Sequence, residues 1–96
     1  MNTLLKILLA DDHSVVRRGV ALILKESFPE ATIIHAESFD QVMHVLPEEK
    51  PNVLILDINL PGGNSAAMVE KAKKTAPDRK ILMFSAFDEE QYALRY

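Results

Sequence analysis

Three aspartates and one serine follow short apolar runs in this sequence, where side chains are well placed for chemistry. The runs and the polar residues behind them are 4–10 with Asp11 and Asp12, 53–56 with Asp57, and 81–84 with Ser85. Carboxylates brought together from separate runs repel one another unless a cation joins them. Mg²⁺ suits carboxylate oxygens, because it binds one or two carboxylates and keeps several waters. The pattern therefore favours a magnesium site.

A site of this kind could accept a phosphoryl group. Mg²⁺ with free coordination positions holds phosphate oxygens and offsets the charge that develops during transfer. Asp57 could act as the nucleophile and form an aspartyl phosphate, with the Ser85 hydroxyl bonded to the phosphoryl oxygens. A single aspartate after a strand is also a common turn or helix-capping residue. Three of them in one short chain are harder to explain in that way.

Four segments are predicted to be strands that position these residues. They are the apolar runs at 4–10, 32–34, 53–56 and 81–84. Their apolar residues are nearly continuous and do not alternate with polar ones. This pattern is typical of strands that are covered on both faces, as in a parallel sheet.

Helical patterns separate the strands. Val16, Val20, Ile23 and Leu24 recur at helical spacing, and Ser38 with Gln41 forms a capping box for a second helix. We expect Pro47 and Pro51 to end that second helix. A third helix, capped by Asn64 or Ser65, should stop before Pro77, and a fourth should run from Asp88 to Tyr96.

The alternation of strands and helices predicts an α/β fold with a parallel sheet and right-handed crossovers. In open sheets of this kind, sites form beyond the carboxyl ends of the strands. Asp11, Asp12, Asp57 and Ser85 all follow such ends. They should therefore meet at one edge of the sheet.

The composition indicates one globular domain over residues 1–96, with 48% apolar and 26% charged residues. The absence of cysteine excludes disulfides and thiolate metal sites and fits a cytoplasmic location. No run approaches the roughly 18 apolar residues of a membrane span. Lys6 interrupts the first run, so we do not expect a signal peptide. The net charge of −3 argues against nucleic-acid binding by this part of the protein.

Three motifs resemble the receiver domains of two-component response regulators, the CheY-like domains. They are LLADDH at 8–13 with Arg17 and Gly19, VLILDINLPG at 53–62, and ILMFSA at 81–86. The residues of the first motif look like those of the NarL/FixJ type. In that type the receiver precedes a helix-turn-helix DNA-binding domain, so DNA would be bound only through a separate output domain.

The resemblance implies a role for each matching residue. Asp57 would accept the phosphoryl group from a phosphohistidine on a sensor histidine kinase, and Ser85 would be the switch hydroxyl. Mg²⁺ would be held by Asp12 directly, by Asp11 through water, by Asp57 and by the backbone carbonyl of Asn59. His13 is not expected to be a ligand, because Mg²⁺ prefers oxygen.

The resemblance also implies a flavodoxin-like, doubly wound sheet in the order 2-1-3-4-5, with strand 5 and helix 5 absent from this chain. The family's fifth-strand lysine would be absent with them. The fourth strand would then be an open edge, and part of the first helix would be uncovered, which predicts a homodimer or a swapped dimer. The loop at Gly63 and Ser65 departs from the family pattern, and we expect it to be more flexible.

The favoured function is thus a phosphorylated signalling switch rather than a metabolic enzyme. One alternative is a receiver-like interaction or dimerisation module that is not phosphorylated in this form. Another is an aspartyl-phosphate hydrolase like the haloacid dehalogenase phosphatases. Such hydrolases need a second carboxylate two residues after the nucleophile, and this sequence has Asn59 there.

Overall fold

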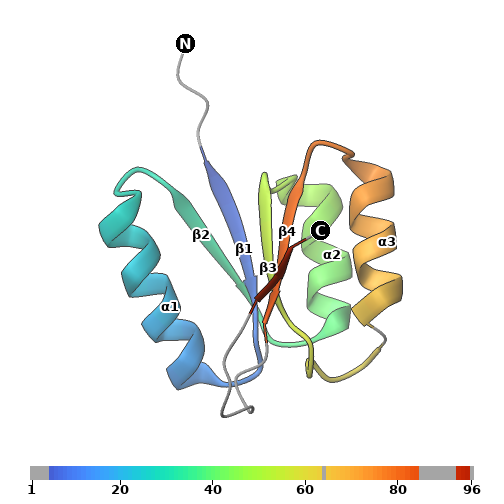
Figure 1. The fold of residues 1–96 in the computed structure, drawn as a ribbon, viewed down its shortest axis with the longest axis horizontal. Coiled ribbons are helices and arrows are strands. Elements are labelled where there is room, and N and C mark those ends of the chain that lie inside the picture. The colour runs from blue at the N-terminus through green and yellow to red at the C-terminus, as the bar shows by residue number, and fades with distance from the viewer. Residues whose placement is uncertain (1–4, 64, 85–92, 96) are drawn as a thin grey trace.

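A single sheet with helices on both faces forms the fold, α1 on one face and α2 and α3 on the other (Figure 1). The computed structural model describes residues 5–63, 65–84 and 93–95. The strands are β1 (Lys6–Ala10), β2 (Thr32–Ala36), β3 (Val53–Asp57), β4 (Lys80–Phe84) and β5 (Ala93–Arg95), and the helices are α1 (Ser14–Ser27), α2 (Phe39–Glu49) and α3 (Ser65–Thr75). Within these described ranges, no helix has the length and apolar character needed to cross a membrane.

The four predicted strands form a parallel sheet in the order β2-β1-β3-β4, which confirms the expected α/β fold. The register places Ala10 of β1 beside Leu56 of β3, and Asp57 beside Phe84 of β4. The carboxyl ends of β1, β3 and β4 therefore lie at one edge. This edge is where the polar residues were expected to meet.

The outer edge of β4 differs from the prediction. We expected it to be open, but β5 pairs antiparallel with residues 82–84 of β4. The helix expected from Asp88 to Tyr96 is accordingly wrong at 93–95, and its parts at 88–92 and at 96 lie outside the described residues. An unpaired strand presents a row of free N–H and C=O groups, and pairing with β5 satisfies some of them.

The second helix also ends later than predicted. α2 continues through Pro47 to Glu49 and ends at Lys50, which adopts a left-handed conformation with φ 51°. Proline removes one backbone donor but leaves the later ones in place. Lys50 donates its N–H to the Leu46 carbonyl at 3.1 Å, so the last turn is still closed by a hydrogen bond. Ser38 caps the other end as predicted, accepting the Gln41 N–H.

Two apolar layers hold the sheet between the helices. The layer under α2 and α3 is the larger and includes Leu8, Leu54, Leu56, Ile81, Val42 and Met68. The layer under α1 contains Ile7, Leu9 and Ile55, with Val20 and Leu24 packed against it. α1 also carries Val15, Leu22 and Ile23 on its exposed surface. The self-association expected from an uncovered first helix stays a prediction, to be measured by light scattering.

Arg79 joins the end of α3 to the start of β3 and is only 4% exposed. Its Nε donates to the Pro51 carbonyl at 2.9 Å, and its Nη1 donates to the Ala72 carbonyl at 2.9 Å and to Thr75 Oγ1 at 3.1 Å. Helix C-termini leave carbonyls without partners inside the helix, and a cation there also complements the helix dipole. The buried arginine is therefore explained by packing and capping.

The loop after Asp57 rests on the first residue of α2. Phe39 donates its N–H to the Pro61 carbonyl at 3.2 Å, and a Cβ at Gly63 would lie 2.9 Å from Phe39 Cγ. Phe39 is buried, so its ring has little room to yield. The loop therefore packs against the ring at Gly63, where a larger residue would require a shift, and its expected flexibility stays a prediction.

Gly63→Ala should destabilise the fold by about 1–3 kcal/mol, the usual range for overpacking a tight contact. Urea unfolding measures this change. Gly19→Ala is the matched control, because a Cβ at Gly19 in α1 would meet nothing within 4 Å. That variant should be neutral or slightly stabilising, since alanine favours helix. Equal stability of the two variants would contradict the proposed contact with Phe39.

Candidate functional site

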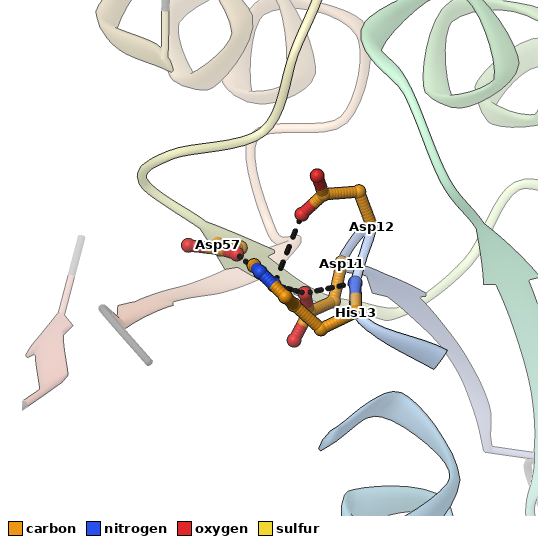
Figure 2. A group of neighbouring side chains, drawn as sticks. All are labelled: Asp11, Asp12, His13 and Asp57. Atoms are coloured by element: carbon orange, nitrogen blue, oxygen red, sulfur yellow. Dashed lines mark hydrogen bonds and ion pairs between the residues drawn. The ribbon is translucent and has the colours of Figure 1, made fainter. Parts of the chain in front are cut away.

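An acidic cluster lies at the carboxyl edge of the sheet, as predicted. Asp57 is the last residue of β3, and Asp11 and Asp12 directly follow β1. One ligand atom from each of Asp11, Asp12, His13 and Asp57 lies within 4.8 Å of the others (Figure 2). Asp11 and Asp57 are fully buried, while Asp12 is exposed. The neighbouring strands thus bring all three predicted carboxylates together.

Backbone N–H groups orient the two buried carboxylates. His13 donates its N–H to Asp11 Oδ1 at 2.9 Å, and Asn59 donates its N–H to Asp57 Oδ1 at 3.0 Å. In each case the donor is two residues after the aspartate, which is the geometry of an Asx turn. Each turn fixes one oxygen of its carboxylate. The other oxygen, Oδ2, has no hydrogen-bond partner among the described residues in either aspartate.

Burial raises the pKa of Asp57, because the charged carboxylate loses its hydration. The nearby Asp11 and Asp12 raise this pKa further, whereas the Asn59 N–H acts in the opposite direction by stabilising the charged form. The charged form of the Asp57 carboxylate is therefore disfavoured in this environment. A positive charge placed beside the Asp57 carboxylate would stabilise its charged form.

The His13 side chain lies among the carboxylates, a position that the sequence did not predict. Its Nδ1 is 3.1 Å from Asp11 Oδ1, 3.1 Å from Asp12 Oδ1 and 3.8 Å from Asp57 Oδ2. The hydrogen bond with Asp11 is the main reason that the pKa of His13 is raised. The sequence could have indicated this position, because His13 directly follows the aspartate pair at the end of β1 and therefore lies at the same edge of the sheet. The prediction that His13 is not a magnesium ligand stays a prediction.

The residues of the cluster fit a small, hard cation. Two buried carboxylate oxygens, Asp11 Oδ2 and Asp57 Oδ2, have no hydrogen-bond partner among the described residues, and this observation carries the conclusion. Buried polar atoms in native proteins nearly always have a partner. An ion with oxygen ligands would supply one to both atoms, and Asp12 adds a third carboxylate at the solvent side. Asp11, Asp12 and Asp57 are thus the side chains that could hold it.

The structure leaves the predicted roles of two other site residues, Asn59 and Ser85, untested. Asn59 follows Asp57 by two residues, and its N–H holds the Asp57 carboxylate. The predicted role of its backbone carbonyl as a cation ligand stays a prediction. Ser85 lies outside the described residues, and its predicted role also stays a prediction. The residue before it, Phe84, ends β4 beside Asp57 and accepts the Ile58 N–H at 2.8 Å.

Arg17 is a buried contact of the site that the sequence indicated only as part of a motif. Its Nη1 donates to the Asp11 backbone carbonyl at 2.7 Å, and its Nε donates to His35 Nδ1 at 3.1 Å. Burial, followed by the nearby Arg17 and Arg18, lowers the pKa of His35. A charged residue on the buried side of an amphipathic helix was the available signal, since such residues are almost always paired.

Comparisons with known proteins agree with this geometry. The model of the response regulator receiver domain family matches residues 7–96. The oxygen regulatory protein NreC of Staphylococcus epidermidis is 40% identical over 90 residues, which cover 92% of this chain and 41% of that protein. NreC of Staphylococcus aureus is 35% identical over 89 residues, with the same coverage of 92% and 41%. The chain thus spans about two fifths of these relatives.

Solved structures show the same fold. RcsB from Salmonella enterica serovar Typhimurium, bound to a promoter in the presence of the phosphomimetic BeF3−, superposes with a TM-score of 0.72 at 25% identity, over 84% of this chain and 41% of that one. The signal receiver domain of a DNA-binding response regulator from Colwellia psychrerythraea gives a TM-score of 0.79 at 20% identity, over 90% of this chain and 72% of that one. Because the family model matches nearly the whole chain and NreC is similar across it, the chain belongs to the response regulator receiver domain family.

Proposed function

We propose that Asp57 accepts a phosphoryl group from the phosphohistidine of a sensor kinase, in a site completed by Mg²⁺. The observation that carries the proposal is the buried Asp57 carboxylate, which stands beside Asp11 at the carboxyl edge of the sheet and has one oxygen that no described residue hydrogen-bonds. Asp11, Asp12 and Asp57, with the Asn59 backbone carbonyl, would hold the ion. When bound, Mg²⁺ would offset the negative charge of the phosphoryl group.

The chain's own residues prepare Asp57 for this role. The Asn59 N–H holds Oδ1, which leaves Oδ2 as the attacking oxygen. A bond forms between Oδ2 and phosphorus while the phosphorus–nitrogen bond of the donor breaks, and the electron pair stays on the donor imidazole. His13 Nδ1 lies 3.8 Å from Oδ2. We expect the His13 side chain to turn away as the donor approaches.

We further propose that phosphorylation controls a DNA-binding output domain beyond this chain, in the cytoplasm. The relatives named NreC are more than twice as long as the matched segment. RcsB, which is similar to this chain over 41% of its own length, has been solved on promoter DNA. The receiver itself has a net charge of −3 and is poorly suited to bind DNA. It would act as the switch, catalysing only its own phosphoryl uptake and loss.

Intact-mass spectrometry after incubation with Mg²⁺ and phosphoramidate tests the proposal. The chain should gain one phosphoryl group, and Asp57→Asn should abolish the gain. Asp78→Asn, which changes an exposed aspartate distant in sequence from the cluster, should leave it intact. Omission of Mg²⁺ with added EDTA should also prevent uptake.

Failure of the unmodified chain to take up phosphate would favour the alternative of an interaction module that is not phosphorylated. The same measurement on a longer product that contains this chain separates two cases. Uptake only by the longer product would mean that residues beyond this chain are needed. Failure of both would overturn the proposed function.

A further inference from the structure

Arg17 connects three parts of the structure around the acidic cluster. Its side chain is largely buried, with the residue 8% exposed. From α1, its Nη1 donates to the Asp11 carbonyl at 2.7 Å, its Nε donates to His35 Nδ1 at 3.1 Å, and its Nη2 lies 3.5 Å from Glu37 Oε2. Two of these partners belong to β2 or directly follow it, and the third directly follows β1.

The turn at residues 11–13 is held from both sides as a result. Asp11 donates its N–H to the Ala36 carbonyl at 3.0 Å, while its own carbonyl accepts the Arg17 side chain. The Arg17 backbone N–H donates to the His13 carbonyl at 2.9 Å. One residue therefore binds both ends of the turn, through its side chain at Asp11 and through its backbone at His13.

These contacts require an arginine. A guanidinium presents donors in a fixed plane, whereas a lysine amine is a single point on a flexible stem. Lysine at position 17 could reach the Asp11 carbonyl or His35, but it could not donate to both in the geometry of the guanidinium. His35 must accept at Nδ1 and carry its proton at Nε2, because Arg17 can only donate. Glu37 supplies the negative charge at the outer end.

We infer that Arg17 is a positioning residue: it holds the turn at 11–13 so that Asp11 and Asp12 can carry the cation, and His35 orients its guanidinium. The inference rests on the proposed function, because it assigns Arg17 a role in the cation affinity of that site. Arg17 touches only the backbone of Asp11, so its effect on the ion is indirect. Residues that orient metal ligands typically change metal affinity by about 10–100-fold when they are replaced.

The test compares Mg²⁺ affinity by isothermal titration calorimetry in folded Arg17→Lys and in the unmodified chain. Arg17→Lys should bind Mg²⁺ at least about tenfold more weakly. Arg18→Lys is the matched control, an exposed arginine on the same helix, and should bind as the unmodified chain does. His35→Leu removes the acceptor and should weaken binding, whereas His35→Asn retains an acceptor oxygen and should weaken it less.

A second readout follows the turn itself. The His13 N–H, bonded to Asp11 Oδ1, should exchange with solvent faster in Arg17→Lys than in Arg18→Lys, at equal global stability. If Arg17→Lys does not fold, His35→Leu provides the same comparison. Unchanged affinity and unchanged His13 exchange would overturn the inference. If the unmodified chain binds no Mg²⁺, the magnesium site of the proposed function is refuted for this chain, and unchanged His13 exchange would refute positioning independently.

Discussion

Asp57→Asn should make the cation-free protein more stable at neutral pH, by about 1–3 kcal/mol, the usual range for relieving a buried group that lacks a partner. The Asp57 carboxylate is fully buried, and its Oδ2 has no hydrogen-bond partner among the described residues. An asparagine oxygen can still accept the Asn59 N–H. Its amide nitrogen would stand where Oδ2 stands and could donate to Asp11 Oδ2, which no described residue hydrogen-bonds.

The pH dependence should have a definite sign. The pKa of Asp57 is raised in the folded protein above the ordinary value of about 3.9, so the folded state binds this proton more tightly than the unfolded state. The contribution of Asp57 to stability therefore improves as the pH falls from neutral through the folded-state pKa towards 3.9. Asparagine has no such dependence. The advantage of Asp57→Asn should be largest at neutral pH and shrink on acidification.

Urea unfolding in EDTA at several pH values measures this difference. Asp78→Asn, at an exposed aspartate, is the control and should change stability by less than about 0.5 kcal/mol. Added Mg²⁺ should stabilise the unmodified chain and should have much less effect on Asp57→Asn, since a ligand stabilises only the state that binds it. A less stable Asp57→Asn variant at neutral pH would show that the buried carboxylate is already well compensated.

Arg79→Met should cause the largest loss of stability among the variants considered, about 3 kcal/mol or more, because hydrogen bonds to a charged group contribute roughly 1.5–3 kcal/mol each. Methionine retains the apolar stem but removes every donor. The Pro51 carbonyl then loses the Arg79 Nε donor, and the Ala72 carbonyl loses the charged donor but keeps the Ala76 N–H and the Thr75 hydroxyl. For a domain whose total stability is typically about 5–15 kcal/mol, this loss would populate unfolded molecules.

Chemical denaturation compares Arg79→Met with Arg18→Met, which changes an exposed arginine in α1. The control should stay within about 0.5 kcal/mol of the unmodified chain. Arg79→Lys should fall between the two, because an ammonium keeps the charge and donors but lacks the rigid fork that reaches both carbonyls. Arg79→Met as stable as Arg18→Met would mean that water replaces the lost donors. Phosphoryl uptake by the molecules that remain folded should be unaffected. Arg79 lies at the amino end of β4, whereas Asp57 lies at the carboxyl end of the neighbouring β3.

The sequence predicted the parallel sheet and the acidic cluster because both depend on local patterns. Continuous apolar runs mark buried strands, and the polar residues after them must meet at one edge if the strands are parallel. Asp11, Asp12 and Asp57 meet there in the structure. The roles of Ser85 and of the Asn59 carbonyl are not decided by these patterns.

The errors arose where contacts between distant segments override local preference. A pattern that begins at Asp88 reads as helical, yet Ala93–Arg95 pairs with the edge of β4. Pro47 reads as a helix end, yet α2 gains a further turn that closes at Lys50. The partners of Arg17 could not be predicted, because they are 6 and 18 residues away and lie outside its helix. Spacing in one segment cannot show such partners.

The contact between Phe39 and Gly63 has a mechanical consequence. Phe39 is the first residue of α2, and it holds the loop after Asp57 through its N–H and its ring. The loop and the first turn of α2 are therefore joined, and we expect a displacement of the loop after Asp57 to move that turn as well. In relaxation-dispersion NMR, residues 61–63 and Phe39 should exchange between conformations at one common rate. Gly63→Ala should separate the two rates, because the added methyl group pushes the ring away from the loop.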